Sequence, residues 1–191
     1  MDRLGETMDR KLLVGTDAGV ILIEGDTVGG ELWAGKVALD TDGGSVRCLG
    51  RDPATGRLLA GLAMTGAGLH ASPGLGSPWT PVPGWPEDRA AWALAPVGGG
   101  RMVVASDGPT DLLLGSILDG GWKPSDAFRA IPERSAWDFM DLPDGAHVLG
   151  FSRDPLAARR WLAAVETGGV VASRDDGASW SAQGLVYEGP S

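Results

Sequence analysis

The sequence predicts an all-β fold built from about four copies of one repeat. Apolar residues make up 43% of the 191 residues, and they stand in short runs of strand length, such as Val20–Ile23 and Met102–Ala105. Between the runs stand many of the 31 glycines and 13 prolines, which are the residues that turns require. Tryptophan also recurs at a fairly regular interval: Trp33, Trp79, Trp122 and Trp180.

Two segments show the repeat most clearly. Residues 51–79 and 153–180 each open with Arg-Asp-Pro, pass through an apolar run to Thr-Gly, reach Ala-Ser and end at tryptophan. Pro96 and Trp122 keep the same spacing in a third copy, and residues 12–33 form a fourth copy that is shortened at its start. The runs are apolar on both faces, so we expect sheets that stack on one another. A period of about 43 residues with about four strands is typical of a β-propeller blade.

We therefore expect a flexible N-terminus at residues 1–10 and a single β-propeller domain at residues 11–191, with four-stranded antiparallel sheets as blades. A β-sandwich is the alternative fold, but it would not require internal repetition. The expected blades and a closing strand lie at residues 11–40, 45–85, 89–126, 134–183 and 184–188.

The last repeat is longer than the others, and its surplus falls within residues 127–159. Two registers stay open there. In the first register, residues 134–142 form the first strand of the last blade, because Arg134–Trp137 resembles Arg89–Trp92. In the second register, residues 146–152 form that strand and residues 127–142 are an insertion.

Ring closure is a separate question. The first blade has no first strand before residue 11, and Leu185–Glu188 after the last tryptophan could supply one. The total length agrees with about four periods, so we favour a closed or nearly closed monomer slightly over a homodimer of eight blades. A partial propeller, or a fragment of a longer product, would expose strand edges and an apolar sheet face.

One short motif sits in the last repeat. Ser173, Asp175, Gly177 and Trp180 follow the pattern Ser-x-Asp-x-Gly-x-x-Trp. An aspartate in a tight hairpin accepts hydrogen bonds from turn N–H groups, and glycine takes the positive φ that such a turn needs. The residue types therefore indicate a structural turn that the tryptophan ring covers.

With this motif inside a propeller-like repeat, the chain resembles the BNR/Asp-box (WD40/YVTN/sortilin-like) β-propeller superfamily. That superfamily includes sialidases, sortilin-type receptor domains and a photosystem II assembly factor. The resemblance covers about residues 11–188, although only the last copy holds the complete motif. It implies that Asp175 is structural and lies away from any active site.

The resemblance also raises an enzymatic reading. Sialidases carry a Phe/Tyr-Arg-Ile-Pro motif, and Phe128–Pro132 is similar but has an extra residue, Ala130. The single tyrosine, Tyr187, is a poor candidate for the family's nucleophile. We therefore expect a non-enzymatic binding or scaffold protein with degenerate Asp-box repeats; the alternative is a degenerate sialidase-like glycoside hydrolase or glycan-binding domain.

Composition argues against several other classes of protein, namely nucleic-acid-binding, metal-binding and membrane proteins. A formal net charge of −9 without a Lys/Arg stripe argues against nucleic-acid binding. Cys48, His70 and His147 have no companions at metal-ligand spacing, so neither a metal nor another cofactor is expected. No run approaches the ~18 apolar residues of a membrane span and no signal peptide is visible, so we expect a cytoplasmic protein without a membrane partner.

The surplus segment is the best candidate for a binding surface, because extra loops on a repeat scaffold commonly carry recognition. Arg129, Trp137 and Asp138 are the candidate residues for an unknown protein, small-molecule or glycan ligand. Trp85 and Trp161 are the remaining tryptophans that the repeat does not explain.

Overall fold

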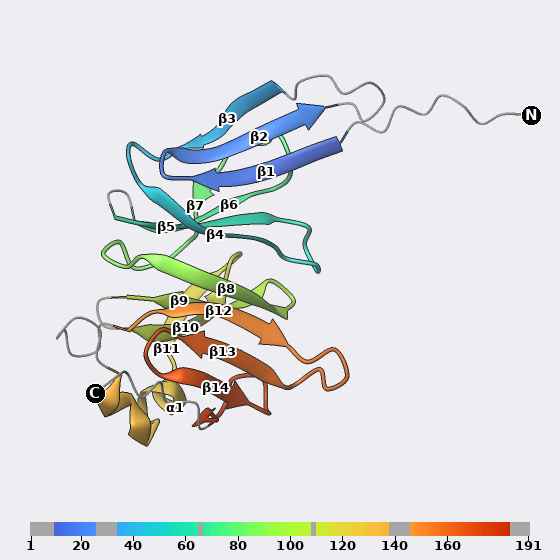
Figure 1. The fold of residues 1–191 in the computed structure, drawn as a ribbon. Helices are drawn as coiled ribbons and strands as arrows, with labels where there is room; N and C mark the ends of the chain where they lie inside the picture. The colour runs from blue at the N-terminus through green and yellow to red at the C-terminus, as the bar shows by residue number, and fades with distance from the viewer. Residues whose placement is uncertain (1–9, 26–33, 65–66, 108–109, 138–145, 184–191) are drawn as a thin grey trace, which may run out of the picture.

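The structure, a computed structural model, describes residues 10–25, 34–64, 67–107, 110–137 and 146–183. These residues form four antiparallel sheets that follow one another along the chain and stack face to face (Figure 1). The all-β architecture of four sheets predicted from the repeat is thereby confirmed.

The strands within each sheet are adjacent in chain order, so every sheet is a simple meander. The first sheet has three strands within the described residues, and each later sheet has four. The first two sheets contain β1 (Arg10–Thr16), β2 (Gly19–Gly25), β3 (Ala34–Asp40), β4 (Ser45–Arg51), β5 (Leu58–Ala63), β6 (Gly68–Ser72) and β7 (Thr80–Pro81). The last two contain β8 (Ala91–Gly98), β9 (Arg101–Ser106), β10 (Asp111–Ser116), β11 (Gly120–Pro124), β12 (Val148–Arg153), β13 (Trp161–Val165), β14 (Gly169–Ser173) and β15 (Ser181–Ala182).

The fourth sheet starts at β12, so the register that used residues 146–152 describes the structure, and the expected blade start at residue 134 was wrong. The resemblance of Arg134–Trp137 to Arg89–Trp92 is misleading, because the two segments fold differently. Between β11 and β12 the chain forms a helical turn, α1 (Asp126–Arg129), and a 3-10 helix (Pro132–Ala136). Ser125 caps α1 by accepting a hydrogen bond from the Phe128 N–H at 3.2 Å.

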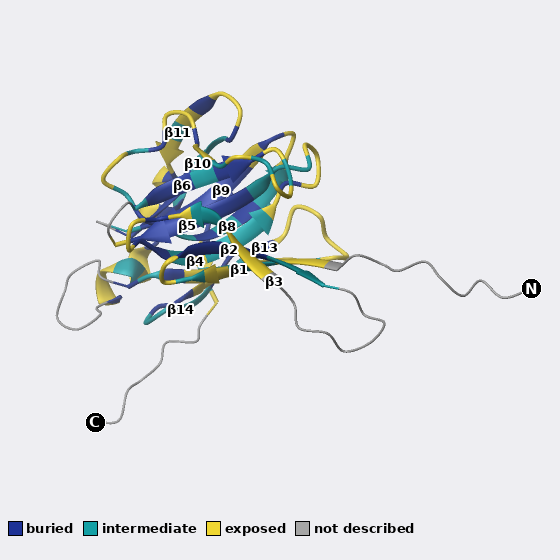
Figure 2. Ribbon diagram, turned by 90° about the horizontal axis from the view of Figure 1, so that it is seen from above, coloured by how far each residue is buried: buried dark blue, intermediate teal, exposed yellow. Residues whose placement is uncertain are grey.

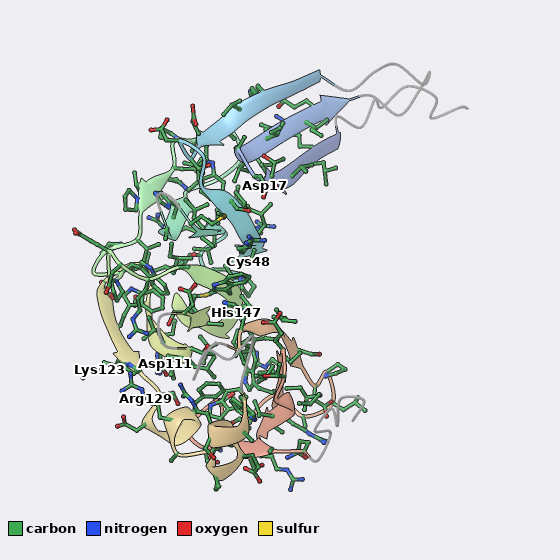
Figure 3. The ribbon with its side chains drawn as sticks, turned by 60° about the vertical axis from the view of Figure 1, so that its left-hand side comes forward. Asp17, Cys48, Asp111, Lys123, Arg129 and His147 are labelled. Carbon is green, nitrogen blue, oxygen red and sulfur yellow. The ribbon has the colours of Figure 1, made fainter. Side chains whose placement is uncertain are left out.

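The sheets are arranged as an open arc. The first strands of the last three sheets, β4, β8 and β12, lie next to one another along its inner side, and β1 packs on β4. Figure 3 shows the arc from the side, with the first and last sheets at its two ends. The expected closing strand at residues 184–188 lies outside the described residues.

The repeated Arg-Asp-Pro sequence forms the same kind of turn in both copies. Asp52, which is fully buried, accepts hydrogen bonds from the N–H groups of Ala54 and Thr55. Asp154 accepts one from the Leu156 N–H at 2.8 Å. An aspartate that binds the backbone two or three residues on stabilises a tight turn, which explains why this tripeptide recurs at the same place in the repeat.

Sheet-to-sheet packing is close because small residues receive large ones. A Cβ atom added at Gly15 of the first sheet would stand 2.6 Å from Val46 Cγ1 of the second. One added at Gly50 would collide with Leu94 of the third sheet. Buried residues gather in the second and third sheets and on the face of the fourth sheet that packs on the third. By contrast, β3 at the edge of the first sheet is largely exposed (Figure 2).

We expect Gly61→Ala to destabilise the protein by about 1–3 kcal/mol, as overpacking a core does. The new Cβ would stand 2.5 Å from the carbonyl oxygen of Ala91, a backbone atom that cannot move aside. Urea unfolding followed by tryptophan fluorescence measures the change.

Gly74→Ala is the matched control, because a Cβ there meets nothing within 4 Å and its φ is not in the left-handed region. Its free energy of unfolding should stay within about 0.5 kcal/mol of the parent. Equal effects of the two substitutions would show that the sheets are not packed as described.

Candidate functional site

A row of three side chains follows the concave side of the arc. Arg47 stands at a bulge of β4, Trp92 at the equivalent bulge of β8, and His147 just before β12. The Arg47 guanidinium lies 4.9 Å from the Trp92 ring centroid, and the rings of Trp92 and His147 are 3.9 Å apart. Figure 3 places His147 on this inner side.

Two carboxylates hold this row in place. Trp92 Nε1 donates a hydrogen bond to Asp107 Oδ2 at 2.9 Å, and His147 Nδ1 lies 2.8 Å from Glu166 Oε2. Asp107 follows β9 and Glu166 follows β13, so both come from hairpins at the same end of their sheets. Each carboxylate is engaged by a ring nitrogen, which suits positioning of the rings better than acid–base chemistry on a substrate.

A cavity of about 230 Å³ lies at the other end of the inner strands. It opens where β8 and β12 end, and Arg153 is its charged residue. The lining residues are Pro53, Leu94, Ala95, Pro96, Val97, Gly98, Phe151, Arg153 and Trp161. The Arg153 guanidinium stands 5.2 Å from the Trp161 ring centroid and 3.8 Å from Asp176 Oδ1. The cavity therefore combines apolar and aromatic walls with one anchored cation.

A second, more open depression of about 500 Å³ lies over the third sheet. Glycines make up much of its lining, and Arg101, Lys123 and Asp119 are its charged residues. It offers charge but no aromatic ring, so a ligand would find fewer apolar contacts there than in the smaller cavity.

The structure does not bring the predicted site residues together on an open surface. Arg129 donates a hydrogen bond from Nε to Asp111 Oδ2 at 2.8 Å, and Asp111 is fully buried. Trp137 is 3% exposed and packs on Phe128 and Gly168, so its ring cannot present a face to a ligand. Asp138 lies outside the described residues.

Arg129 also lies on the convex side of the arc, away from the row that includes His147 (Figure 3). Its guanidinium neutralises a buried carboxylate at the start of β10, which is a structural task. The sialidase-like sequence Phe128–Pro132 therefore does not place an arginine at the concave side or in the cavity.

The Ser-x-Asp-x-Gly-x-x-Trp motif forms a closed turn between β14 and β15. Asp175 accepts hydrogen bonds from the Ser173 hydroxyl and the Ser179 N–H, each at 2.8 Å, and from the Ser179 hydroxyl at 2.6 Å. Ser173 Oγ accepts the Gly177 N–H at 2.8 Å, and Gly177 has φ 85°. Trp180, 9% exposed, covers the turn. The carboxylate of Asp175 and the hydroxyl of Ser173 are therefore engaged within the turn, whereas the buried Trp180 Nε1 has no hydrogen-bond partner in the described structure.

Burial shifts the pKa values of the cysteine thiol and of one of the two histidines. Burial raises the pKa of the Cys48 thiol to about 12, so the thiolate is scarce at neutral pH. Burial also lowers the pKa of His70. Within the described part of the chain, no group of three or more His, Cys, Asp or Glu side chains is placed to hold a metal ion.

Charge is divided between the two ends of the sheets. In each four-stranded sheet, an antiparallel meander, the loops after the first and third strands share one end, which we call the upper end, and the opposite end is the lower end. In the first sheet the turn between β1 and β2 lies at the lower end, because Asp17 accepts a hydrogen bond there from Ser45 at the start of β4. The upper end carries Arg51, Arg57, Arg101, Arg153, Arg159, Arg160 and Arg174, together with Asp52, Asp119, Asp154, Asp175 and Asp176. Acidic residues are in excess at the lower end, where Arg89, Arg129 and Arg134 also stand: Asp17, Asp40, Asp42, Glu87, Asp88, Asp107, Asp111, Asp126, Glu133 and Glu166. Thus the cavity opens at the end where arginines outnumber aspartates, in a protein whose net charge is −9.

Sequence reasoning missed both the row and the cavity. Their residues come from different repeats, and no short motif joins them. One signal was available: Arg51 and Arg153 occupy the same place in two copies of the repeat, at the end of an inner strand. A search of equivalent repeat positions for residues that differ between copies would also have singled out Arg47 and Trp92.

Comparison with known proteins supports the fold. The chain is similar to the GH74 xyloglucanase of Xanthomonas campestris, with 22% identity and a TM-score of 0.61 over 89% of this chain and 27% of that one. It is also similar to YCF48, solved bound to D1 peptide, with 16% identity and a TM-score of 0.59 over 100% of this chain and 58% of that one. Both are β-propeller proteins, and at this identity the likeness shows the β-propeller fold alone.

Neither a protein-family model nor a curated protein sequence matches the chain. The chain spans less than two thirds of the length of either structural neighbour. No helix in the described residues is long and apolar enough to cross a membrane.

We expect Asp175→Asn to lower the free energy of unfolding at pH 7 by about 1 kcal/mol, the net worth of one hydrogen bond. Hydrogen bonds from the Ser179 hydroxyl, the Ser179 N–H and the Ser173 hydroxyl hold the Asp175 pKa below its ordinary 3.8. A lowered folded-state pKa stabilises the protein above the unfolded pKa, and this stabilisation fades as the pH falls from 3.8 through the folded value.

The difference between parent and variant in urea unfolding should therefore shrink below pH 3.8. Asp88→Asn, an exposed carboxylate in the loop before β8, is the control and should change little at either pH. A constant difference at all pH values would mean that the carboxylate charge has no part in the turn.

Proposed function

We propose that this chain is a non-enzymatic binding propeller that holds an extended, acidic peptide segment of another protein in the cavity at the ends of β8 and β12. The observation that carries the proposal is the chemistry of the lining. Leu94, Val97, Phe151 and Trp161 supply apolar and aromatic contacts, and Arg153 supplies the one charge. A peptide with an apolar side chain next to a carboxylate satisfies both.

Two further features support an acidic partner. Arg153 is positioned by Trp161 and Asp176, so little side-chain entropy is lost when its remaining donors bind a carboxylate. At the upper end around the cavity the arginines outnumber the aspartates although the chain as a whole carries −9, so an acidic segment meets less repulsion at this end than elsewhere. YCF48, a neighbour in fold, was solved with a bound peptide, so the architecture is compatible with peptide binding.

Glycoside hydrolysis is the competing function, because the other neighbour is a xyloglucanase. It ordinarily needs two carboxyl groups about 5–10 Å apart that face the same sugar. Among the described residues, no aspartate or glutamate lines the cavity, and Asp119 is the one carboxylate that lines the larger depression. Phe151 and Trp161 could still stack on a sugar ring, so glycan binding is the second candidate.

The proposal predicts a defined selection result. Short random peptides displayed on phage and selected on the intact protein should be enriched in Asp or Glu next to Leu, Phe or Trp. Arg153→Gln should weaken binding of the selected peptide, measured by fluorescence anisotropy, by about 10-fold or more, because a charge-assisted hydrogen bond is worth about 1.5–3 kcal/mol.

Arg101→Gln removes the same charge from the same end of the protein but lies outside the cavity, and it should change the affinity less than about 3-fold. Thermal unfolding of both variants excludes loss of fold. If the two variants lost peptide affinity equally, the binding would depend on general charge attraction and not on the cavity. Binding or cleavage of xyloglucan oligosaccharides without peptide binding would establish the competing function instead.

A further inference from the structure

The four sheets can be compared position by position, because their strands pair in the same register. In the second sheet Gly50 pairs with Leu59 and Leu59 with Ala71. In the fourth sheet Ser152 pairs with Leu162 and Leu162 with Ala172. The inner strand of each later sheet carries its bulge at the same place. Equivalent residues can therefore be named, and their burial compared.

Each sheet has a trailing face toward the next sheet along the chain and a leading face toward the previous one. On the trailing face, Val20, Leu69 and Leu112 occupy equivalent positions in the first three sheets and are 0%, 1% and 0% exposed. The equivalent residue of the fourth sheet, Val170, is only half-buried, and its neighbour Ala164 is exposed. The trailing face of the fourth sheet thus has the residues of an internal contact but no sheet upon it in the described structure.

The leading face of the first sheet is open in the same way. Ala60, Val104 and Ala163 hold one position on the leading faces of the second, third and fourth sheets, and each is 0% exposed. Val14, their equivalent in the first sheet, is half-buried. In the described strands, the aliphatic side chains on this face are Leu12, Val14, Ile21, Ile23 and Val37, and Leu12 and Val37 are 51% and 66% exposed.

The two open faces also match in bulk. Inside the chain, a glycine of the trailing face receives an aliphatic side chain of the next leading face, as Gly50 receives Leu94. The open trailing face offers small residues in the same way: a Cβ at Gly150 would meet nothing within 4 Å, and Ala164 lies beside it. The open leading face offers the bulky partners. A surface with this pattern is best covered by a sheet of this repeat.

We propose that a second copy of this chain covers both faces. The trailing face of the fourth sheet in each copy packs on the leading face of the first sheet in the other, and a two-fold axis closes the two arcs into one ring. Each copy carries both halves of the contact, so two identical contacts form and no apolar face is left over. Chain length alone favoured a closed monomer; the separation of the two ends of the arc favours the pair instead.

Size-exclusion chromatography with light scattering tests the proposal on the full chain. The expected mass is twice 19.7 kDa at all concentrations above the dissociation constant. A mass of 19.7 kDa up to high concentration would overturn it, and would mean that the faces stay open or meet another protein. Masses that keep growing with concentration would overturn the closed pair in favour of an open chain of copies.

Variants at the two faces identify the contact. Val37→Glu and Ala164→Glu each place an unpaired charge in the proposed contact, so each should give a folded monomer. Leu156→Glu, at a position 96% exposed in the loop after β12, is the control for the same added charge and should remain paired. Circular dichroism and thermal unfolding confirm that each variant is folded.

A mixing experiment separates this contact from other ways of pairing. The Val37→Glu copy keeps an intact trailing face and the Ala164→Glu copy keeps an intact leading face, so the mixture should recover pairs joined by one contact. If Ala164→Glu alone leaves the parent mass unchanged, or if the mixture stays monomeric, the leading-to-trailing contact is wrong.

Discussion

The contact between successive sheets is the interaction on which the rest of the structure depends. It works because glycine or alanine on one face admits the aliphatic side chain of the next, as Gly15 admits Val46 and Gly50 admits Leu94. Such close approach excludes water and fixes the angle between sheets. It brings β4, β8 and β12 side by side, and only for that reason do Arg47, Trp92 and His147 meet although they belong to three different repeats.

The meander within each sheet then decides where charge can act. Loops alternate between the two ends, so the Arg-Asp-Pro turns and the Ser-x-Asp-x-Gly-x-x-Trp turn share the upper end. At that end several aspartates are used by the turns themselves: Asp52 and Asp154 bind backbone N–H groups, and Asp175 binds Ser173 and Ser179. The arginines project around these turns, and Arg153 and Arg159 pair with Asp176, so the small positive excess at this end arises because its arginines outnumber its aspartates.

The sequence predicted the fold well because the repeat is written in local features: strand-length apolar runs, turn residues and a spaced tryptophan. The prediction from sequence was wrong where the same short residue pattern adopts two different structures. Ala-Trp at 136–137 resembles Ala-Trp at 91–92, but Trp137 fills the core beside Gly168 whereas Trp92 faces the concave side. The prediction that Arg129 binds a ligand was made without knowing its partner. Arg129 binds the buried Asp111, which lies 18 residues away in sequence, and no local pattern indicates that contact. The cavity is built from contacts between repeats, and such contacts produce no fixed spacing of residues in the sequence from which they could be predicted.

The two outer sheets differ from the ends of most repeat arrays. An end repeat ordinarily replaces the apolar residues of its open face with polar ones, because that face meets water. Here Val14 and Val170 keep aliphatic side chains at positions that are buried in the internal sheets. The two end faces of the arc thus carry the residue types of internal sheets, as they would in a segment of a closed ring. Its cavity, however, is lined by the second, third and fourth sheets of one chain and uses neither open face. Ligand binding and the covering of the end faces are therefore physically separable, and a loss of one does not entail a loss of the other.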